Sequence, residues 1–124
     1  MTKMNNKIDD TVTNKVNTIK DLIRQGKPEF AQFESAKLIT QYPGNVMALC
    51  VMSYTLYVSN DLKNALRYAH LAYAKINAES SWKDIISASN ALLMMNENEE
   101  AIRVLCCRMF RFKASRKNSN SENP

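Results

Sequence analysis

Side chains able to carry out acid–base, nucleophilic or metal chemistry are few in this chain, and they are scattered. His70 is the single histidine, and neither a Gly-rich phosphate loop nor metal-ligand spacing accompanies it. The three cysteines, Cys50, Cys106 and Cys107, are odd in number and lack CxxC spacing. The sequence therefore predicts no catalytic residues, no metal site, no cofactor and no small-molecule substrate.

Two acidic clusters have a structural interpretation. Glu97, Glu99 and Glu100 come at the start of a predicted helix, where negative charge is favourable beside the helix dipole. Asp9 and Asp10 stand in the same relation to the first predicted helix. We therefore interpret both clusters as helix caps rather than as cation sites.

The carboxy-terminal region holds the excess of positive charge. Residues 1–102 contain eleven basic and eleven acidic side chains, whereas residues 103–124 contain six basic side chains and only Glu122, which accounts for the net charge of +5. A solvated tail is the simpler interpretation, and contact with nucleic acid is the alternative. That alternative would use five basic residues: Arg103, Arg108, Arg111, Arg116 and Lys117. No aromatic platform accompanies them, so we expect no nucleic-acid partner.

Membrane contact is a second alternative for this region. Cys106 and Cys107 followed by Arg108 and Arg111 could combine lipidation with a basic patch. The two cysteines lie within the apolar stretch AIRVLCCRMF, where cysteine usually behaves as a small buried hydrophobe. The amino end lacks a secretory signal pattern, and no segment has the roughly 20 apolar residues of a membrane span. We expect a soluble cytoplasmic protein with reduced thiols and no membrane partner.

Helical periodicity runs through most of the chain, which has only two glycines and three prolines. The sequence predicts an all-α fold of 124 residues, with a flexible leader at 1–7, a helical-repeat domain at 8–112 and a disordered basic tail at 113–124. The domain divides into units of about 8–43, 44–79 and 80–112. The predicted helices are 8–25, 28–42, 46–58, 62–76, 82–95 and 99–112.

The helix predicted at 46–58 has no charged residue, and its stretch VMALCVMSYTLYV is apolar nearly all round. At this length it is too short to span a bilayer, and Pro43 and Gly44 prevent a longer helix. A helix that is apolar on every side must be covered by neighbours. We therefore expect it to be sandwiched between the other helices.

One pattern recurs three times: a turn residue followed by an alanine, at Gly26 to Ala31, Asn60 to Ala65 and Asn96 to Ala101. The alanines are 34 and then 36 residues apart. This organisation resembles the tetratricopeptide repeat, a helix-turn-helix unit of about 34 residues. The resemblance implies three stacked helical hairpins that form a short right-handed superhelix.

The middle unit, beginning at Val46, matches the repeat best. Asn60 stands at its turn, and Ala65 and Ala72 stand at its two small positions. No unit has the early tryptophan and following glycine of the family together, and Leu38 and Arg108 replace the later small residue in the outer units. An ordinary helix bundle is the alternative architecture.

In the tetratricopeptide family, the inner face of each first helix lines a groove that binds another polypeptide. The equivalent positions in the first unit are Thr13, Val16, Lys20, Ile23 and Arg24. In the middle unit they are Met47, Cys50, Tyr54, Tyr57 and Val58. In the third unit they are Lys83, Ile86, Asn90, Leu93 and Met94. From these we predict a partner-binding groove formed by Val16, Ile23, Met47, Cys50, Tyr54, Tyr57, Val58, Ile86, Asn90, Leu93 and Met94.

Such a groove would be mainly apolar. Met adapts its shape and Tyr combines a large contact area with a polar rim, which suits the apolar stripe of an amphipathic helix. A ligand with acidic groups would instead need several Lys, Arg and Asn side chains aimed inward. The alternative is that the same residues complete the core of a self-contained bundle.

In length, repeat number and apolar groove, the chain resembles the tetratricopeptide-like chaperones of bacterial type III secretion. The resemblance implies a virulence-associated chaperone that binds the amphipathic helix of a secreted needle subunit and prevents its premature polymerisation. It also implies a small helical co-chaperone, for which Ile19, Phe30 and Phe33 form the candidate face. A general adaptor in a cytosolic complex is the alternative.

Overall fold

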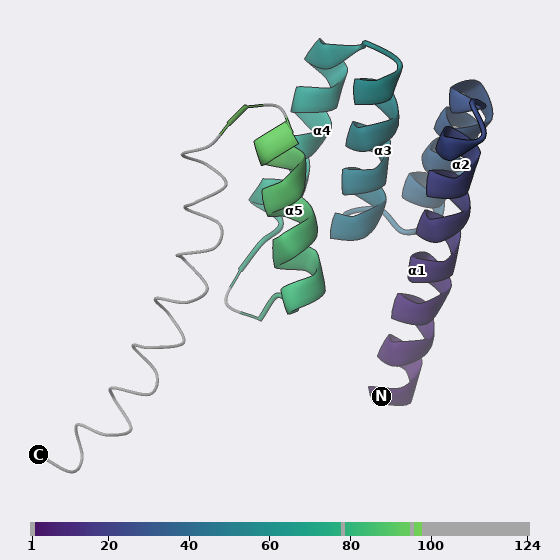
Figure 1. Cartoon of the computed structure of the whole chain (residues 1–124). Helices are drawn as coiled ribbons and strands as arrows, with labels where there is room; N and C mark the ends of the chain where they lie inside the picture. Colours follow the sequence, from purple (N-terminus) through teal and green to yellow (C-terminus); the bar gives the residue numbers. More distant parts are fainter. Residues whose placement is uncertain (1, 78, 95, 98–124) are drawn as a thin grey trace, which may run out of the picture.

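The computed structural model describes residues 2–77, 79–94 and 96–97, and within these the chain is all-α, as predicted (Figure 1). Its helices are α1 (Thr2–Arg24), α2 (Pro28–Gln41), α3 (Val46–Val58), α4 (Leu62–Ala74) and α5 (Trp82–Met94). No described residue belongs to a strand. The predicted helix at 99–112, with Ala101, and the predicted tail at 113–124 lie outside the described residues.

The amino-terminal helix differs from the prediction. α1 begins at Thr2 rather than near Ile8, so residues 2–7, predicted as a leader, belong to it. These residues include neither Gly nor Pro, so nothing in the backbone stops the helix before Thr2. The starts of α2, α3, α4 and α5 agree with the sequence-based boundaries.

The three predicted turns share one geometry. Gly26, Asn60 and Asn96 all have positive φ, at 76°, 66° and 65°. This left-handed conformation is typical just after a helix and favours glycine and asparagine. The residue after each of these positions donates its N–H to a carbonyl oxygen near the end of the preceding helix. These hydrogen bonds run from Lys27 to Leu22 (2.9 Å), from Asp61 to Leu56 (2.9 Å) and from Glu97 to Leu92 (2.8 Å). The repeat is therefore present in the backbone as well as in the sequence.

Polar side chains cap the amino ends of three helices. Asn45 accepts a hydrogen bond from the N–H of Ala48 at the start of α3 (3.1 Å). Ser81 does the same for the N–H of Asp84 at the start of α5 (3.1 Å). Asp61 accepts a hydrogen bond from the N–H of Asn64 in the first turn of α4. These caps satisfy N–H groups that have no partner inside the helix.

The helices form hairpins that stack side by side, with α3 at the centre (Figure 1). α3 contacts α1, α2, α4 and α5, and most of its residues are buried, which confirms the predicted sandwiched helix. Ala31 and Ala65, two of the three repeated alanines, are completely buried in apolar clusters between helices. The first helices of successive units, α1, α3 and α5, also contact one another in order. This arrangement brings their inner faces together.

Candidate partner-binding groove

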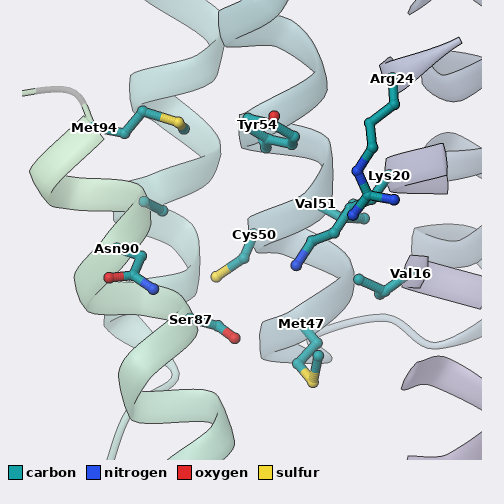
Figure 2. A pocket seen from close by; sticks show the side chains of 11 residues that line it. Val16, Lys20, Arg24, Met47, Cys50, Val51, Tyr54, Ser87, Asn90 and Met94 are labelled. Atoms are coloured by element: carbon teal, nitrogen blue, oxygen red, sulfur yellow. The ribbon is translucent and has the colours of Figure 1, made fainter. Parts of the chain in front are cut away.

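A cavity of about 320 Å³ lies between α1, α3 and α5, and we call it the inner pocket (Figure 2). Its lining residues come from the first helices of all three units: Val16, Lys20, Arg24, Met47, Cys50, Val51, Tyr54, Ser87, Asn90, Ala91 and Met94. The stacking of α1, α3 and α5 therefore creates a site that no single hairpin contains.

The floor of the inner pocket is a stripe along α3. Cys50 and Val51 follow Met47 by three and four residues and precede Tyr54 by four and three, so all four share one side of the helix. Cys50 and Val51 are buried, whereas Met47 and Tyr54 are only half-buried and offer apolar surface to the cavity. This floor can hold apolar side chains of a ligand.

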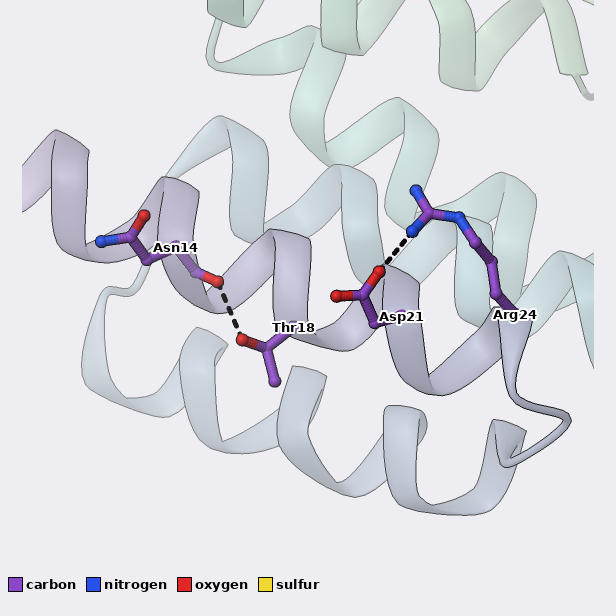
Figure 3. A network of polar contacts seen from close by, with 4 residues as sticks. All are labelled: Asn14, Thr18, Asp21 and Arg24. Atoms are coloured by element: carbon purple, nitrogen blue, oxygen red, sulfur yellow. Dashed lines mark hydrogen bonds and ion pairs between the residues drawn. The ribbon is translucent and has the colours of Figure 1, made fainter.

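The wall on α1 is cationic. Val16, Lys20 and Arg24 are each separated by one helical turn, and the two charged side chains extend toward the pocket (Figure 2). Arg24 also forms an ion pair with Asp21 on the same helix (Figure 3). The prediction of a mainly apolar groove is thus incomplete, because the groove positions of the first unit bring two cations to its edge.

The opposite wall, on α5, carries no charge. Ser87, Asn90, Ala91 and Met94 line it, and they combine a hydroxyl, an amide and two apolar groups. This wall can accept or donate hydrogen bonds but cannot repel or attract a charged ligand strongly. The inner pocket is therefore asymmetric, with positive charge on one side only.

Six of the predicted groove residues meet at the inner pocket. They are Val16, Met47, Cys50, Tyr54, Asn90 and Met94. The other five lining residues were not in the predicted groove: Lys20 and Arg24, which stand at equivalent positions of the first unit, and Val51, Ser87 and Ala91, which do not. Val51, Ser87 and Ala91 each follow a predicted position by one residue, so helical spacing could have identified them only with the rotation of each helix known.

Five predicted groove residues do not line the inner pocket. Ile23 is half-buried and packs against the apolar cluster of α1, α2 and α3. Tyr57 and Val58 lie in the last turn of α3, beyond the floor, and both are exposed. Ile86 and Leu93 on α5 are 50% and 46% exposed and do not contribute to the pocket lining.

The candidate co-chaperone face needs one correction. Phe30 and Phe33 on α2 are 64% and 62% exposed, which suits a docking surface. Ile19 on α1 is only 1% exposed, because it packs into the apolar cluster between α1, α2 and α3. It is a core residue and cannot contact a partner on the same face.

The Cys50 thiol lies in the floor of the inner pocket. Burial raises the pKa of the Cys50 thiol to about 12, so the nucleophilic thiolate is scarce near neutral pH. The negative charge of Asp84 adds to this shift, and the positive charge of Lys20 partly offsets it. His70 lies on α4, outside the pocket lining. Among the described residues, His, Cys, Asp and Glu do not gather in groups that could hold a metal ion.

No family model matches the chain, and no curated protein matches it significantly. Within the described residues, no helix combines the length and apolar character needed to cross a membrane.

Proposed function

We propose that this protein is a non-catalytic, cytoplasmic chaperone that binds an amphipathic helix of another protein in the inner pocket. The observation that carries the proposal is the inner pocket itself, an open cavity lined by Met47, Tyr54 and Met94 on the shared face of α1, α3 and α5. A cavity of about 320 Å³ accommodates side chains rather than a whole helix. The partner helix would therefore lie along the face and insert its apolar residues.

The proposed partner is the needle subunit of a type III secretion system. Such a subunit exposes apolar stripes that bind other copies of the subunit. Covering one stripe prevents polymerisation before export. At roughly 25 cal/mol per Å² of apolar surface, an interface of about 800 Å² per partner would hold a helix despite the cost of ordering it.

A second partner, a small helical co-chaperone, is proposed to contact α2. Phe30 and Phe33 support this part of the proposal, because two neighbouring aromatic side chains that are more than half exposed form an apolar patch. The patch lies on a different helix from the pocket lining, so both partners could be bound together.

The test is co-expression of this protein with a needle-type subunit, followed by measurement of the subunit's size in solution. We expect a complex of defined size with the wild-type chain. Tyr54→Glu, which places a charge on the pocket floor, should release the subunit to polymerise. Leu71→Glu is the matched control, because Leu71 is an exposed apolar residue on α4, away from the pocket.

Two outcomes would count against the proposal. One is that the subunit polymerises equally with and without this protein. The other is that Tyr54→Glu and Leu71→Glu weaken capture to the same extent, since a pocket-directed partner must distinguish them. Circular dichroism on both variants would establish that each remains helical.

A further inference from the structure

We infer that the inner pocket selects helices that carry acidic side chains along one edge of their apolar stripe. The inference rests on the proposed function and specifies the chemistry of the partner. It begins from the charge on the lining: Lys20 and Arg24 contribute two cations, and none of the lining residues is Asp or Glu. An apolar stripe alone would leave this cationic wall without a complement.

Lys20 is the more available of the two cations. Arg24 already has an anionic neighbour in Asp21, whereas Lys20 forms no ion pair within the part of the chain that the structure describes. Its side chain extends over the pocket toward Cys50 (Figure 2), and its charge is close enough to lower the pKa of that thiol. A carboxylate from a ligand would therefore meet Lys20 at the edge of the apolar floor.

The acidic side chain of α5, Asp84, does not line the inner pocket. Asp84, on α5, contributes to the pKa of Cys50 but lines a separate depression together with Lys83 and Met47. The α5 wall of the inner pocket has only the uncharged polar groups of Ser87 and Asn90. The charged side chains of the lining therefore all lie on the α1 side.

The spacing of the cations defines the pattern in the ligand. Lys20 and Arg24 are one helical turn apart, so their side chains repeat along the pocket at the pitch of a helix. A ligand helix lying beside α1 would match them with two acidic residues separated by three or four positions. The opposite edge of its apolar stripe would face Ser87 and Asn90 and should be uncharged.

The experiment uses the full-length protein and three synthetic helical peptides with one apolar stripe. The peptides differ only at two positions one turn apart on one edge of the stripe, which are both Glu, both Gln or both Lys. Binding is measured by fluorescence anisotropy. We expect the Glu peptide to bind about tenfold more tightly than the Gln peptide, and the Lys peptide to bind most weakly. In about 0.5 M salt the difference should shrink, because salt screens exposed charges.

Protein variants assign the preference to the α1 wall. The double variant Lys20→Gln with Arg24→Gln should bind all three peptides with nearly the affinity that the wild type has for the Gln peptide. Lys15→Gln with Lys27→Gln is the matched control, because it removes the same charge from exposed residues outside the pocket lining. The control should retain the full preference for Glu.

The outcomes separate the inference from the proposed function. Equal binding of the Glu and Gln peptides, both lost in Tyr54→Glu, would overturn the inference and leave the helix-binding function in place. Equal loss of preference in the control variant would also overturn it, since the preference would then follow net charge. Failure of every peptide to bind would overturn both.

Discussion

Lys83 donates a hydrogen bond from its ammonium group to the hydroxyl of Thr13, at 3.4 Å, and so connects α5 with α1. The two residues occupy equivalent positions in the third and first units, with Met47 of α3 between them in the repeat. The Lys83 side chain therefore bridges α5 and α1 on the side of the stack where Met47 lies between them.

We expect this contact to be weak but measurable. A double-mutant cycle of Thr13→Ala and Lys83→Ala should give a coupling energy of about 0.2–1 kcal/mol, because both groups are solvent-accessible. Urea unfolding of the two single variants and the double variant measures it. Strict additivity of the two single effects would indicate that α1 and α5 do not approach each other in solution.

Ala65→Leu should destabilise the fold strongly. Ala65 is completely buried at the crossing of α3 and α4, where its carbonyl oxygen accepts a hydrogen bond from the Ser53 hydroxyl (2.7 Å). A larger side chain must push the helices apart, which costs about 1–3 kcal/mol of unfolding free energy. Ala74→Leu, at an exposed position of the same helix, is the control and should change stability little. Similar denaturation midpoints for the two variants would contradict the close crossing.

The Cys50 thiol should react slowly with iodoacetamide in the folded protein. Burial raises its pKa from 9.0 to about 12, so the thiolate forms only at strongly alkaline pH. A chain with Cys106→Ser and Cys107→Ser isolates the reaction of Cys50, which mass spectrometry follows. We expect the rate at pH 9 to rise sharply on unfolding in urea. Equal rates in folded and unfolded protein would contradict the prediction.

The same pKa shift has a consequence for stability. Between pH 9.0 and about 12 the unfolded chain loses the Cys50 proton while the folded chain keeps it. The unfolded state binds fewer protons in this range, so the unfolding free energy should fall as pH rises. Cys50→Ala should remove that part of the decline, which is measured as the difference between the two stability curves against pH.

The aromatic pair on α2 should contribute little to folding. Replacing both Phe30 and Phe33 by Ser should change the unfolding free energy by less than about 1 kcal/mol, because both side chains are mostly exposed. The same double change should abolish binding of the proposed co-chaperone to α2, which a pull-down measures. Ile19→Ser is the contrasting variant, and we expect it to lose about 2 kcal/mol or more because Ile19 is buried. Similar stability losses in the two proteins would contradict the assignment of Ile19 to the core.

The sequence was a good guide wherever the interactions are local. The starts of α3 and α4 follow from Asn45 and Asp61, whose side chains cap N–H groups three residues later. The turns at Gly26 and Asn60 follow from residues that tolerate positive φ. The predicted start of α1 was wrong. A helix can extend through residues 2–7 without a residue type in the sequence that marks its beginning.

The composition of the inner pocket depended on the tertiary structure. The sequence placed Lys20 and Met47 at groove positions, but only the packing of α1 against α3 decided that the Lys20 cation reaches the pocket of which Met47 forms the floor. Ile19, next to Lys20 in the chain, was assigned to a surface and instead lies in the core. A rotation of α1 about its axis by the angle between two successive residues would exchange the environments of these two side chains.

Residue order by itself thus determined that this protein is a series of helices separated by turns at a repeat of 34 and 36 residues, because caps, turns and helical hydrogen bonds join residues only a few positions apart. The rotation of each helix about its axis and the approach of α5 to α1 were decided by how buried side chains interdigitate across helices distant in sequence. Through that packing, residues of α1, α3 and α5 together form one pocket, and only its α1 wall carries positive charge.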